Sequence, residues 1–314
     1  MSIAEAMRAG EGRSEFRAAG TDLSERRRSG ISRGPLTDLP ITPDMTGVAW
    51  QADGAVHIGA LTTIAAIAGD SRIAAGYPGI AAAAGGLATP QIRHLATLGG
   101  NLAQRSRCWY FRNPQIACLK KGGTACPARD GNHLYHVAFD LGPCVAPHPS
   151  TMAAALLAYE AKASTSLRAD LPVEALLGDG RDGRIDNALQ PDEIIKSIAL
   201  APPLAGERAL YERAISRSHA EWPLVELVVR AVIADGSFRL VRIAAGGIAP
   251  VPLRLRAAEA AAENAPATMA TVTAATSRAI DGARPLPRTF YKLDLLKGLM
   301  VDLLGSLVEG AVQK

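Results

Sequence analysis

Residues 96–102 read ATLGGNL, a short stretch in which two adjacent glycines stand between a threonine and an asparagine. Glycines let backbone N–H groups approach a phosphate closely, and the side chains of Thr97 and Asn101 can complete a shell around it. The stretch matches neither GxGxxG nor GxxxxGK[ST], so it carries no Rossmann or P-loop fingerprint. Alone it is a weak signal, because a glycine pair is more often only part of a turn.

A second stretch of this kind, AAGTDL, covers residues 18–23. It follows a predicted strand over residues 14–19 and precedes a predicted helix that carries Arg26, Arg27 and Arg28. A basic run of this length is typical of a solvated helix face. The two stretches together predict two anion-binding loops.

All four cysteines fall within 37 residues, and they are Cys108, Cys118, Cys126 and Cys144. Residues 104–150 have little periodicity and predict a long irregular loop, which usually has a function. Disulfides are disfavoured because the chain is neither small nor preceded by a signal peptide, and the close CxxC pairs typical of structural zinc are absent. Cysteines can bind an iron–sulfur cluster at many spacings. The spacing alone therefore does not distinguish between disulfides, a zinc site and an iron–sulfur cluster.

The charge of the chain is uneven. The formal net charge is only +4, but residues 71–129 contain eight Lys and Arg and no Asp or Glu. Such a segment is expected to lower thiol pKa values and to attract an anion such as a pyrophosphate. A basic surface for a partner protein is the alternative.

The composition is that of a globular protein, with 314 residues, 48% hydrophobic and 20% charged, which is enough for two or three packed units. We expect no nucleic acid as a partner, because the charge is weak and aromatic residues are few. No apolar run is long enough to span a membrane, and residues 293–312 predict an amphipathic surface helix instead.

Several elements can be expected from local patterns. Helices are predicted over residues 1–12, 62–68, 77–87, 152–161 and 223–234, and strands over 194–200, 209–216 and 238–245. Pro202-Pro203 marks a boundary between two units.

Taken in order, these segments resemble a known family. ATLGGNL with the preceding PQIR (90–93), AAGTDL, EII (193–195), residues 211–222, AGGIAP (245–250) and FYK (290–292) are similar to the FAD-binding, or medium, subunits of the xanthine dehydrogenase family of molybdenum hydroxylases. QRSR (104–107) before Cys108 and APHPS (146–150) after Cys144 resemble one branch of it, the aldehyde oxidoreductases whose flavin subunit has an extra [4Fe–4S] cluster.

The resemblance implies an α+β fold with an FAD-binding domain of the vanillyl-alcohol-oxidase type over residues 1–203. That domain would consist of two α+β subdomains, about 1–53 and 54–203, and would include the cysteine loop 104–150. Residues 204–314 would form a C-terminal α/β domain like that of the carbon monoxide dehydrogenase flavoprotein.

It also implies site residues, and none of them is catalytic. Cys108, Cys118, Cys126 and Cys144 would bind the [4Fe–4S] cluster. The expected FAD contacts are Ala18, Ala19, Gly20, Thr21, Asp22, Leu23, Thr89, Thr97, Gly99, Gly100, Asn101, His148, Thr151, Ile195 and Arg213. With respect to the cysteines, His133, His136 and His148 are interpreted as structural or surface groups.

The chain departs from the family at three expected FAD contacts. Ala19 stands where the family has the first glycine of AGGT, and its methyl group could crowd a phosphate or require another backbone angle. Thr151 stands where the family has an aspartate. Arg213 replaces a lysine, and this exchange keeps the positive charge.

The function that the resemblance implies is electron transfer within a heterotrimer that oxidises an aldehyde. Electrons would pass from a large molybdenum-cofactor subunit through a small [2Fe–2S] subunit to FAD here, and then to an external acceptor. The cysteine cluster would be a relay or, as we favour, a structural staple. A flavin-free assembly subunit and a zinc-binding interaction module stay open. The expected compartment is the cytoplasm, or the periplasm by co-export with a signal-bearing partner.

Overall fold

The computed structural model of the chain describes Glu5 and residues 15–312, and the helix expected over residues 1–12 lies almost entirely outside them. The N-terminal part has a parallel pair of short strands, β1 (Glu15–Arg17) and β2 (Leu36–Asp38), joined through helix α2 (Leu23–Arg28). The strand expected to end at Gly20 is therefore present but shorter.

The second part is built on an antiparallel five-stranded sheet in the order β3-β4-β7-β5-β6. Its strands are β3 (Val48–Trp50), β4 (Val56–Gly59), β5 (Lys162–Thr165), β6 (Leu171–Pro172) and β7 (Ile195–Leu200), and the turn η1 (Pro43–Met45) precedes β3. Its helices are α3 (Ile64–Gly69), α4 (Ser71–Gly76), α5 (Pro78–Gly86), α6 (Pro90–Leu95), α7 (Leu98–Leu102), α9 (Thr151–Ala158) and α10 (Val173–Leu177).

Side-chain caps explain where several of these helices begin. The hydroxyls of Thr63, Thr89, Thr97 and Ser150 accept hydrogen bonds from the third residue that follows each of them. Each cap satisfies a backbone N–H that the helix itself leaves free. The helices expected over residues 62–68, 77–87 and 152–161 are confirmed as α3, α5 and α9.

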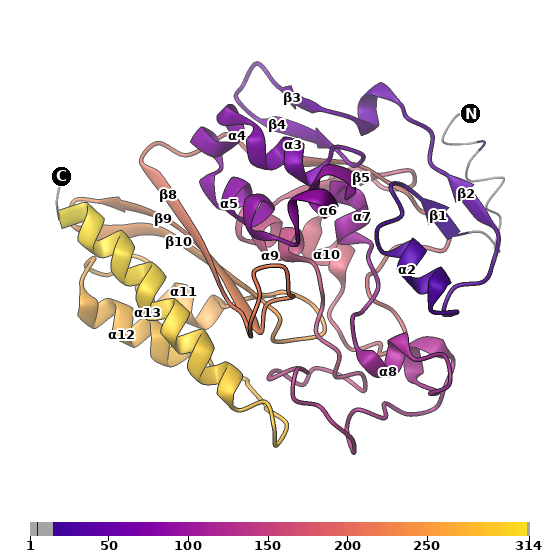
Figure 1. Cartoon of the computed structure of the whole chain (residues 1–314). Coiled ribbons are helices and arrows are strands. Elements are labelled where there is room, and N and C mark those ends of the chain that lie inside the picture. Colours follow the sequence, from indigo (N-terminus) through magenta and orange to yellow (C-terminus); the bar gives the residue numbers. More distant parts are fainter. Residues whose placement is uncertain (1–4, 6–14, 313–314) are drawn as a thin grey trace.

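The third part is an antiparallel four-stranded sheet in the order β11-β10-β9-β8. Its strands are β8 (Glu207–Ala214), β9 (Val225–Ala234), β10 (Ser237–Gly246) and β11 (Leu253–Arg254). Helices α11 (Arg256–Ala262), α12 (Met269–Arg278) and α13 (Tyr291–Val312) cover one face of it, and α5 and α9 pack against the other (Figure 1). The structure thus confirms a mixed α and β fold.

The helix expected over residues 223–234 is wrong, because these residues form strand β9. The run Val-Glu-Leu-Val-Val-Arg-Ala is buried at every position. Leu227 and Val229 face the core under α13, whereas Val228 joins the core around α9. A strand buried on both faces has no apolar–polar alternation, so the sequence pattern could not distinguish it from a helix.

Residues 103–150 form the irregular connection that was expected, with only helix α8 (Trp109–Arg112) and the short turn η2 (Leu119–Lys121) in it. Figure 1 shows this segment along one edge of the molecule, next to α2. No helix in the described part of the chain has the length and hydropathy needed to cross a membrane.

One buried lysine ties the cysteine loop to the third part. Lys292 of α13 is 1% exposed, and its Nζ donates to the carbonyl oxygens of Gly247 at 2.6 Å and Tyr135 at 3.3 Å. Burial lowers the pKa of Lys292 from 10.5 to about 7.

This lysine should make stability depend on pH. Between pH 7 and 10.5, the unfolded chain binds more protons than the folded chain, so the free energy of unfolding should rise with pH. Urea unfolding across this window should show that rise in the wild type, and the Lys292→Met variant should lose it. Lys297→Met, at a less buried position of α13, is the matched control. Equal pH slopes for the wild type and Lys292→Met would contradict the prediction.

Candidate functional site

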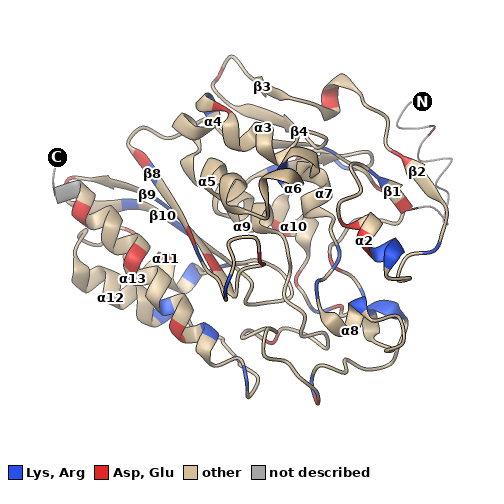
Figure 2. Ribbon diagram, in the orientation of Figure 1, with Lys and Arg blue, Asp and Glu red and all other residues tan. Residues whose placement is uncertain are grey.

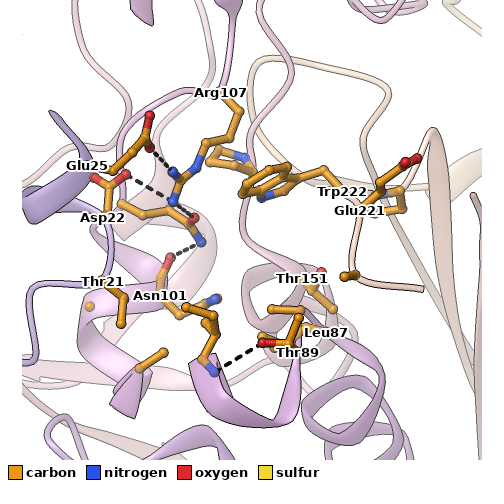
Figure 3. A pocket seen from close by; sticks show the side chains of 18 of the residues that line it. Thr21, Asp22, Glu25, Leu87, Thr89, Asn101, Arg107, Thr151, Glu221 and Trp222 are labelled. Carbon is orange, nitrogen blue, oxygen red and sulfur yellow. Dashed lines mark hydrogen bonds and ion pairs between the residues drawn. The ribbon is translucent and has the colours of Figure 1, made fainter. Parts of the chain in front are cut away.

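A cavity of about 340 Å³ opens between the first, second and third parts of the fold. Residues of both glycine loops line it, together with a loop that connects β8 and β9 (Figure 3). The lining includes Thr21, Asp22, Glu25, Leu87, Thr89, Gly100, Asn101, Gln104, Arg107, Thr151, Arg213, Glu221 and Trp222.

A second cavity of about 320 Å³ adjoins the first at Gly100, which lines both. Ala18, Gly99 and Ile195 also line this second cavity. The two cavities therefore meet beside the ATLGGNL loop. A ligand that occupied both would be elongated and would lie across Gly100 at its middle.

The two adjacent glycines of that loop have different tasks. A Cβ atom on Gly99 would lie 2.8 Å from the Cβ of Ala60, and the Gly99 N–H donates to the Ala60 carbonyl oxygen at 2.8 Å. Gly99 is therefore required for close packing against the end of β4. Gly100 is exposed, and a Cβ there would meet only the Thr97 hydroxyl, at 2.9 Å. Gly100 thus keeps the floor between the two cavities open.

Not every N–H group of this loop is free for an anion. The Gly100 N–H donates to Thr97 Oγ1 at 3.2 Å, and the Asn101 N–H donates to the Thr97 carbonyl oxygen at 2.8 Å. Within the described part of the chain, by contrast, the N–H groups of Ala19, Gly20 and Thr21 donate to no protein acceptor. The AAGTDL loop therefore offers the backbone donors, and the ATLGGNL loop offers the opposing surface.

The alanine in AAGTDL needs no unusual backbone. Gly20 has φ +74°, which favours glycine, whereas Ala19 is not among the described residues with positive φ. Ala19 is exposed, so its methyl group points away from the core. The departure at Ala19 is accommodated without backbone strain.

A network of ion pairs joins α2 to the start of the cysteine loop. Asp22 accepts from Arg112 at 2.7 Å, from Arg107 at 3.0 Å and from Arg26 at 3.0 Å, and Glu25 accepts from both Arg107 and Arg112 at 2.7 Å. Burial raises the pKa of Asp22, but the three guanidinium groups outweigh it and hold the pKa below its usual range. The network braces one wall of the first cavity.

Arg107 and Trp222 close the cavity from opposite sides. The Arg107 guanidinium carbon lies 4.7 Å from the centroid of the Trp222 ring, a cation–π contact. Figure 3 shows Arg107 between the acidic pair on α2 and this indole. Arg213 donates to the carbonyl oxygens of His219 and Glu221, so it holds the loop that carries Trp222. The indole is half exposed, at 52%, and forms the rim.

The cysteines come into one neighbourhood but are not arranged as a metal site. Cys126 and Cys144 are hydrogen-bonded to each other, and Cys108 interacts electrostatically with Cys118 and Cys126. Cys108 Sγ lies 3.2 Å from His136 Nε2. Among the described residues, no group of three or more His, Cys, Asp or Glu side chains is placed to hold a metal ion.

The expectation that the basic segment lowers thiol pKa values is wrong for two cysteines. Burial raises the pKa of Cys108 to about 11. The hydrogen bond between Cys126 and Cys144 lowers the pKa of Cys126 to about 6 and raises that of Cys144.

Ion pairing also makes the local charge around residues 71–129 less positive than the sequence of this segment alone suggests. Five of its cations are paired with acids from elsewhere in the chain, and these pairs are Arg105 and Lys120 with Asp186, Arg107 and Arg112 with Asp22 and Glu25, and Arg129 with Asp140. Figure 2 shows the blue segments of α2 and α8 on neighbouring parts of the fold. The solvated-face interpretation of the arginine run also fails at Arg26, which is 9% exposed and paired with Glu15 and Asp22.

The expected FAD contacts fall into three groups. Thr21, Asp22, Thr89, Gly100, Asn101, Thr151 and Arg213 line the first cavity, and Ala18, Gly99, Gly100 and Ile195 line the second. Ala19, Gly20, Leu23, Thr97 and His148 line neither. Thr97 acts on its loop as the helix cap, and His148 is buried with its Nδ1 accepting from the Ser150 N–H at 3.3 Å. His133 and His136 are buried as well, in accord with a structural role.

Sequence reasoning missed Glu25, Arg107, Glu221 and Trp222 as residues of the site. Arg107 lies in QRSR, and Trp222 is the last residue of the stretch 211–222. Both were therefore among the residues that carry the family resemblance, but neither was assigned to the site. Their contact joins two segments more than a hundred residues apart. No pattern in the neighbouring sequence predicts such a contact.

Comparison with known families agrees with this fold. Residues 2–203 match the FAD binding domain in molybdopterin dehydrogenase, and residues 211–306 match the carbon monoxide dehydrogenase flavoprotein C-terminal domain. The chain therefore belongs to the FAD-binding subunits of the xanthine dehydrogenase and carbon monoxide dehydrogenase family.

Individual relatives lie in the same family. The aldehyde oxidoreductase FAD-binding subunit PaoB of Escherichia coli is 32% identical over 261 residues, which covers 81% of this chain and 78% of that protein. The xanthine dehydrogenase FAD-binding subunit of Escherichia coli is 23% identical and covers 80% of this chain and 72% of that protein.

Solved structures share the fold. A chain of carbon monoxide dehydrogenase from Hydrogenophaga pseudoflava superposes with a TM-score of 0.75 at 22% identity, over 97% of this chain and 93% of that one. A chain of quinoline 2-oxidoreductase from Pseudomonas putida gives a TM-score of 0.74 at 16% identity, over 99% of this chain and 95% of that one.

Proposed function

We propose that this chain is the FAD-carrying electron-transfer subunit of a heterotrimeric molybdenum hydroxylase that oxidises an aldehyde. Its partners would be a large molybdenum-cofactor subunit, a small [2Fe–2S] subunit and an external electron acceptor. The relative at 32% identity is named as an aldehyde oxidoreductase FAD-binding subunit, which favours that branch. The cytoplasmic location stays a prediction.

The observation that carries the proposal is the pair of cavities that meet at Gly100. FAD is an elongated dinucleotide whose two halves are joined by a pyrophosphate, and the pair of cavities fits such a shape. The N–H groups of Ala19, Gly20 and Thr21 donate to no acceptor among the described residues, so they are suited to bind the pyrophosphate. The FAD-binding domain would span residues 1–203 and the C-terminal domain residues 204–314.

The residues of this chain would bind the cofactor and tune it. Asn101, Thr151 and Arg213 offer polar groups to the first cavity, and Ile195 gives the second an apolar wall. Arg213 brings a positive charge, which favours an electron-rich occupant. Trp222 at the rim limits the access of water. FAD supplies, when bound, the two-electron redox chemistry.

The direct test is reconstitution of the purified full chain with FAD. After removal of free cofactor, the absorption spectrum should show one bound flavin for each chain. A flavin-free assembly subunit would show none. Purification from the source cells should then recover two further chains, of which one contains molybdenum and the other [2Fe–2S] centres.

We also propose that Cys108, Cys118, Cys126 and Cys144 hold a [4Fe–4S] cluster as a staple of the irregular loop. The support is the resemblance of the loop to the branch that has this cluster, together with the proximity of the four sulfurs. Because they are not placed as ligands here, the loop would have to adjust around the cluster. The proposed role of the cluster is structural.

Substitution of one ligand separates the possibilities. Cys126→Ser should lose iron and inorganic sulfide and lower the melting temperature, because a loop with little core loses its cross-link. The rate of flavin reduction in the assembled enzyme should stay unchanged. A lower rate at full FAD content would indicate a relay, and zinc in place of iron in the wild type would support the zinc-binding module.

A further inference from the structure

A carboxyl group lies buried beneath the first cavity. Glu226 of β9 is 1% exposed, and the Tyr211 hydroxyl donates to its Oε2 at 3.0 Å. The Thr151 hydroxyl is within hydrogen-bonding reach of both Glu226 and Tyr211. Thr151 lines the cavity (Figure 3). Its hydroxyl therefore links this carboxyl to the space we assign to the flavin.

The sheet is built to hold the carboxyl there. Glu226 pairs with Arg213 on β8 and with Gly246 on β10. A Cβ atom at position 246 would lie 2.4 Å from Glu226 Oε1, so only glycine leaves room for the side chain. The buried position is thus fixed from both neighbouring strands.

Glu226 differs from the other glutamates of the described chain whose side chains are buried in ion pairs. Glu193, Glu207 and Glu259 each have an ion pair with an arginine. The groups that act on Glu226 are the hydroxyls of Thr151 on α9 and Tyr211 on β8, and the more distant charge of Arg213, while β10 offers only Gly246. Burial raises the pKa of Glu226 to about 7, against these three opposing influences.

We propose that Glu226 is the proton-binding group that responds to electron arrival in the first cavity, with the Thr151 hydroxyl as the contact between them. The proposal rests on the proposed function, since it needs a redox cofactor in that cavity. Negative charge gained there disfavours the neighbouring carboxylate, so the carboxylate takes a proton from solvent and an O–H bond forms at Glu226. When the electrons leave, that bond breaks and the proton returns to solvent.

Binding of electrons and of the proton is reciprocal, so the flavin potential must depend on pH through this group. The test measures the midpoint potential of the FAD-loaded chain from mildly acidic to mildly basic pH by spectroelectrochemistry. The wild type should show a change of slope around neutral pH, and Glu226→Gln should lose it. Infrared difference spectra on reduction should show a protonated-carboxyl band in the wild type and not in Glu226→Gln.

Two variants at Thr151 test the proposal independently if Glu226→Gln fails to fold. Thr151→Val removes a hydrogen bond that stabilises the carboxylate, so the change of slope should move to higher pH, whereas Thr151→Ser should keep it in place. Glu207→Gln, at a buried and arginine-paired carboxylate of the same sheet, is the control and should leave the slope unchanged.

The outcomes separate the two proposals. Bound FAD whose pH dependence is the same in the wild type, Glu226→Gln and Thr151→Val would overturn the role of Glu226 and leave the proposed function standing. A wild-type chain that binds no FAD would overturn the proposed function, and the role of Glu226 with it.

Discussion

Replacement of Gly100 by valine should abolish stable FAD binding while the chain stays folded. Gly100 is exposed and lies where the two cavities meet, so its new side chain would project into the path of the ligand. The Cβ would also displace the Thr97 hydroxyl, which lies 2.9 Å away. Overpacking of this kind costs about 1–3 kcal/mol, which corresponds to roughly a fivefold to hundredfold rise in Kd.

Calorimetric titration with FAD and the flavin content after desalting measure this effect. Gly298→Val is the matched control, because Gly298 is an exposed position of α13 with no atom within 4 Å of an added Cβ. It should bind FAD like the wild type. An unchanged Kd for Gly100→Val, with the fold intact by circular dichroism, would show that FAD does not cross the chain at this glycine.

Asp22→Asn should lower the free energy of unfolding by about 3 kcal/mol, because it removes the carboxylate that Arg26, Arg107 and Arg112 share in a largely buried network. The side chains of Asp22, Arg26 and Arg112 are 12%, 11% and 10% exposed, so water replaces little of the lost interaction. The contact between α2 and the cysteine loop should loosen first, since Asp22 is the residue that both share.

Urea unfolding of the full chain checks this prediction, and limited proteolysis shows whether cleavage near residues 104–112 becomes faster. Asp38→Asn is the control, because Asp38 also pairs with an arginine but is exposed at the surface. An exposed ion pair contributes little, so Asp38→Asn should change the unfolding midpoint only slightly. Equal effects of the two substitutions would mean that the network around Asp22 is not a structural brace.

Local chemistry explains which parts of the fold could be predicted. Helices α3, α5 and α9 start where the sequence has a capping residue or a proline and continue through apolar residues. These signals lie within one turn of the residue that they affect. The prediction for residues 223–234 was wrong because strand β9 is buried on both faces by helices that pack on the sheet, among them α9 and α13.

In the candidate site, too, some residues could be predicted from local sequence and others could not. Gly20, Thr97, Gly99 and Gly100 could be found from the sequence, because glycine conformation and helix caps are local properties. The four cysteines could be found as a group, but their pKa values could not, since burial acts on Cys108 more strongly than the nearby positive charges. Arg107 and Trp222 meet only after the second and third parts of the fold have packed together.

The sequence by itself determined the family, the two glycine loops and the cysteine-rich segment, because motifs and their order are properties of the chain. It also located eight positive charges without a negative one between residues 71 and 129. Only the tertiary structure decided what those charges do. Asp22, Glu25, Asp140 and Asp186, all outside the segment, form ion pairs with five of them. The physical reason is that a charge interacts across distance in space, and folding brings together residues that the sequence keeps far apart.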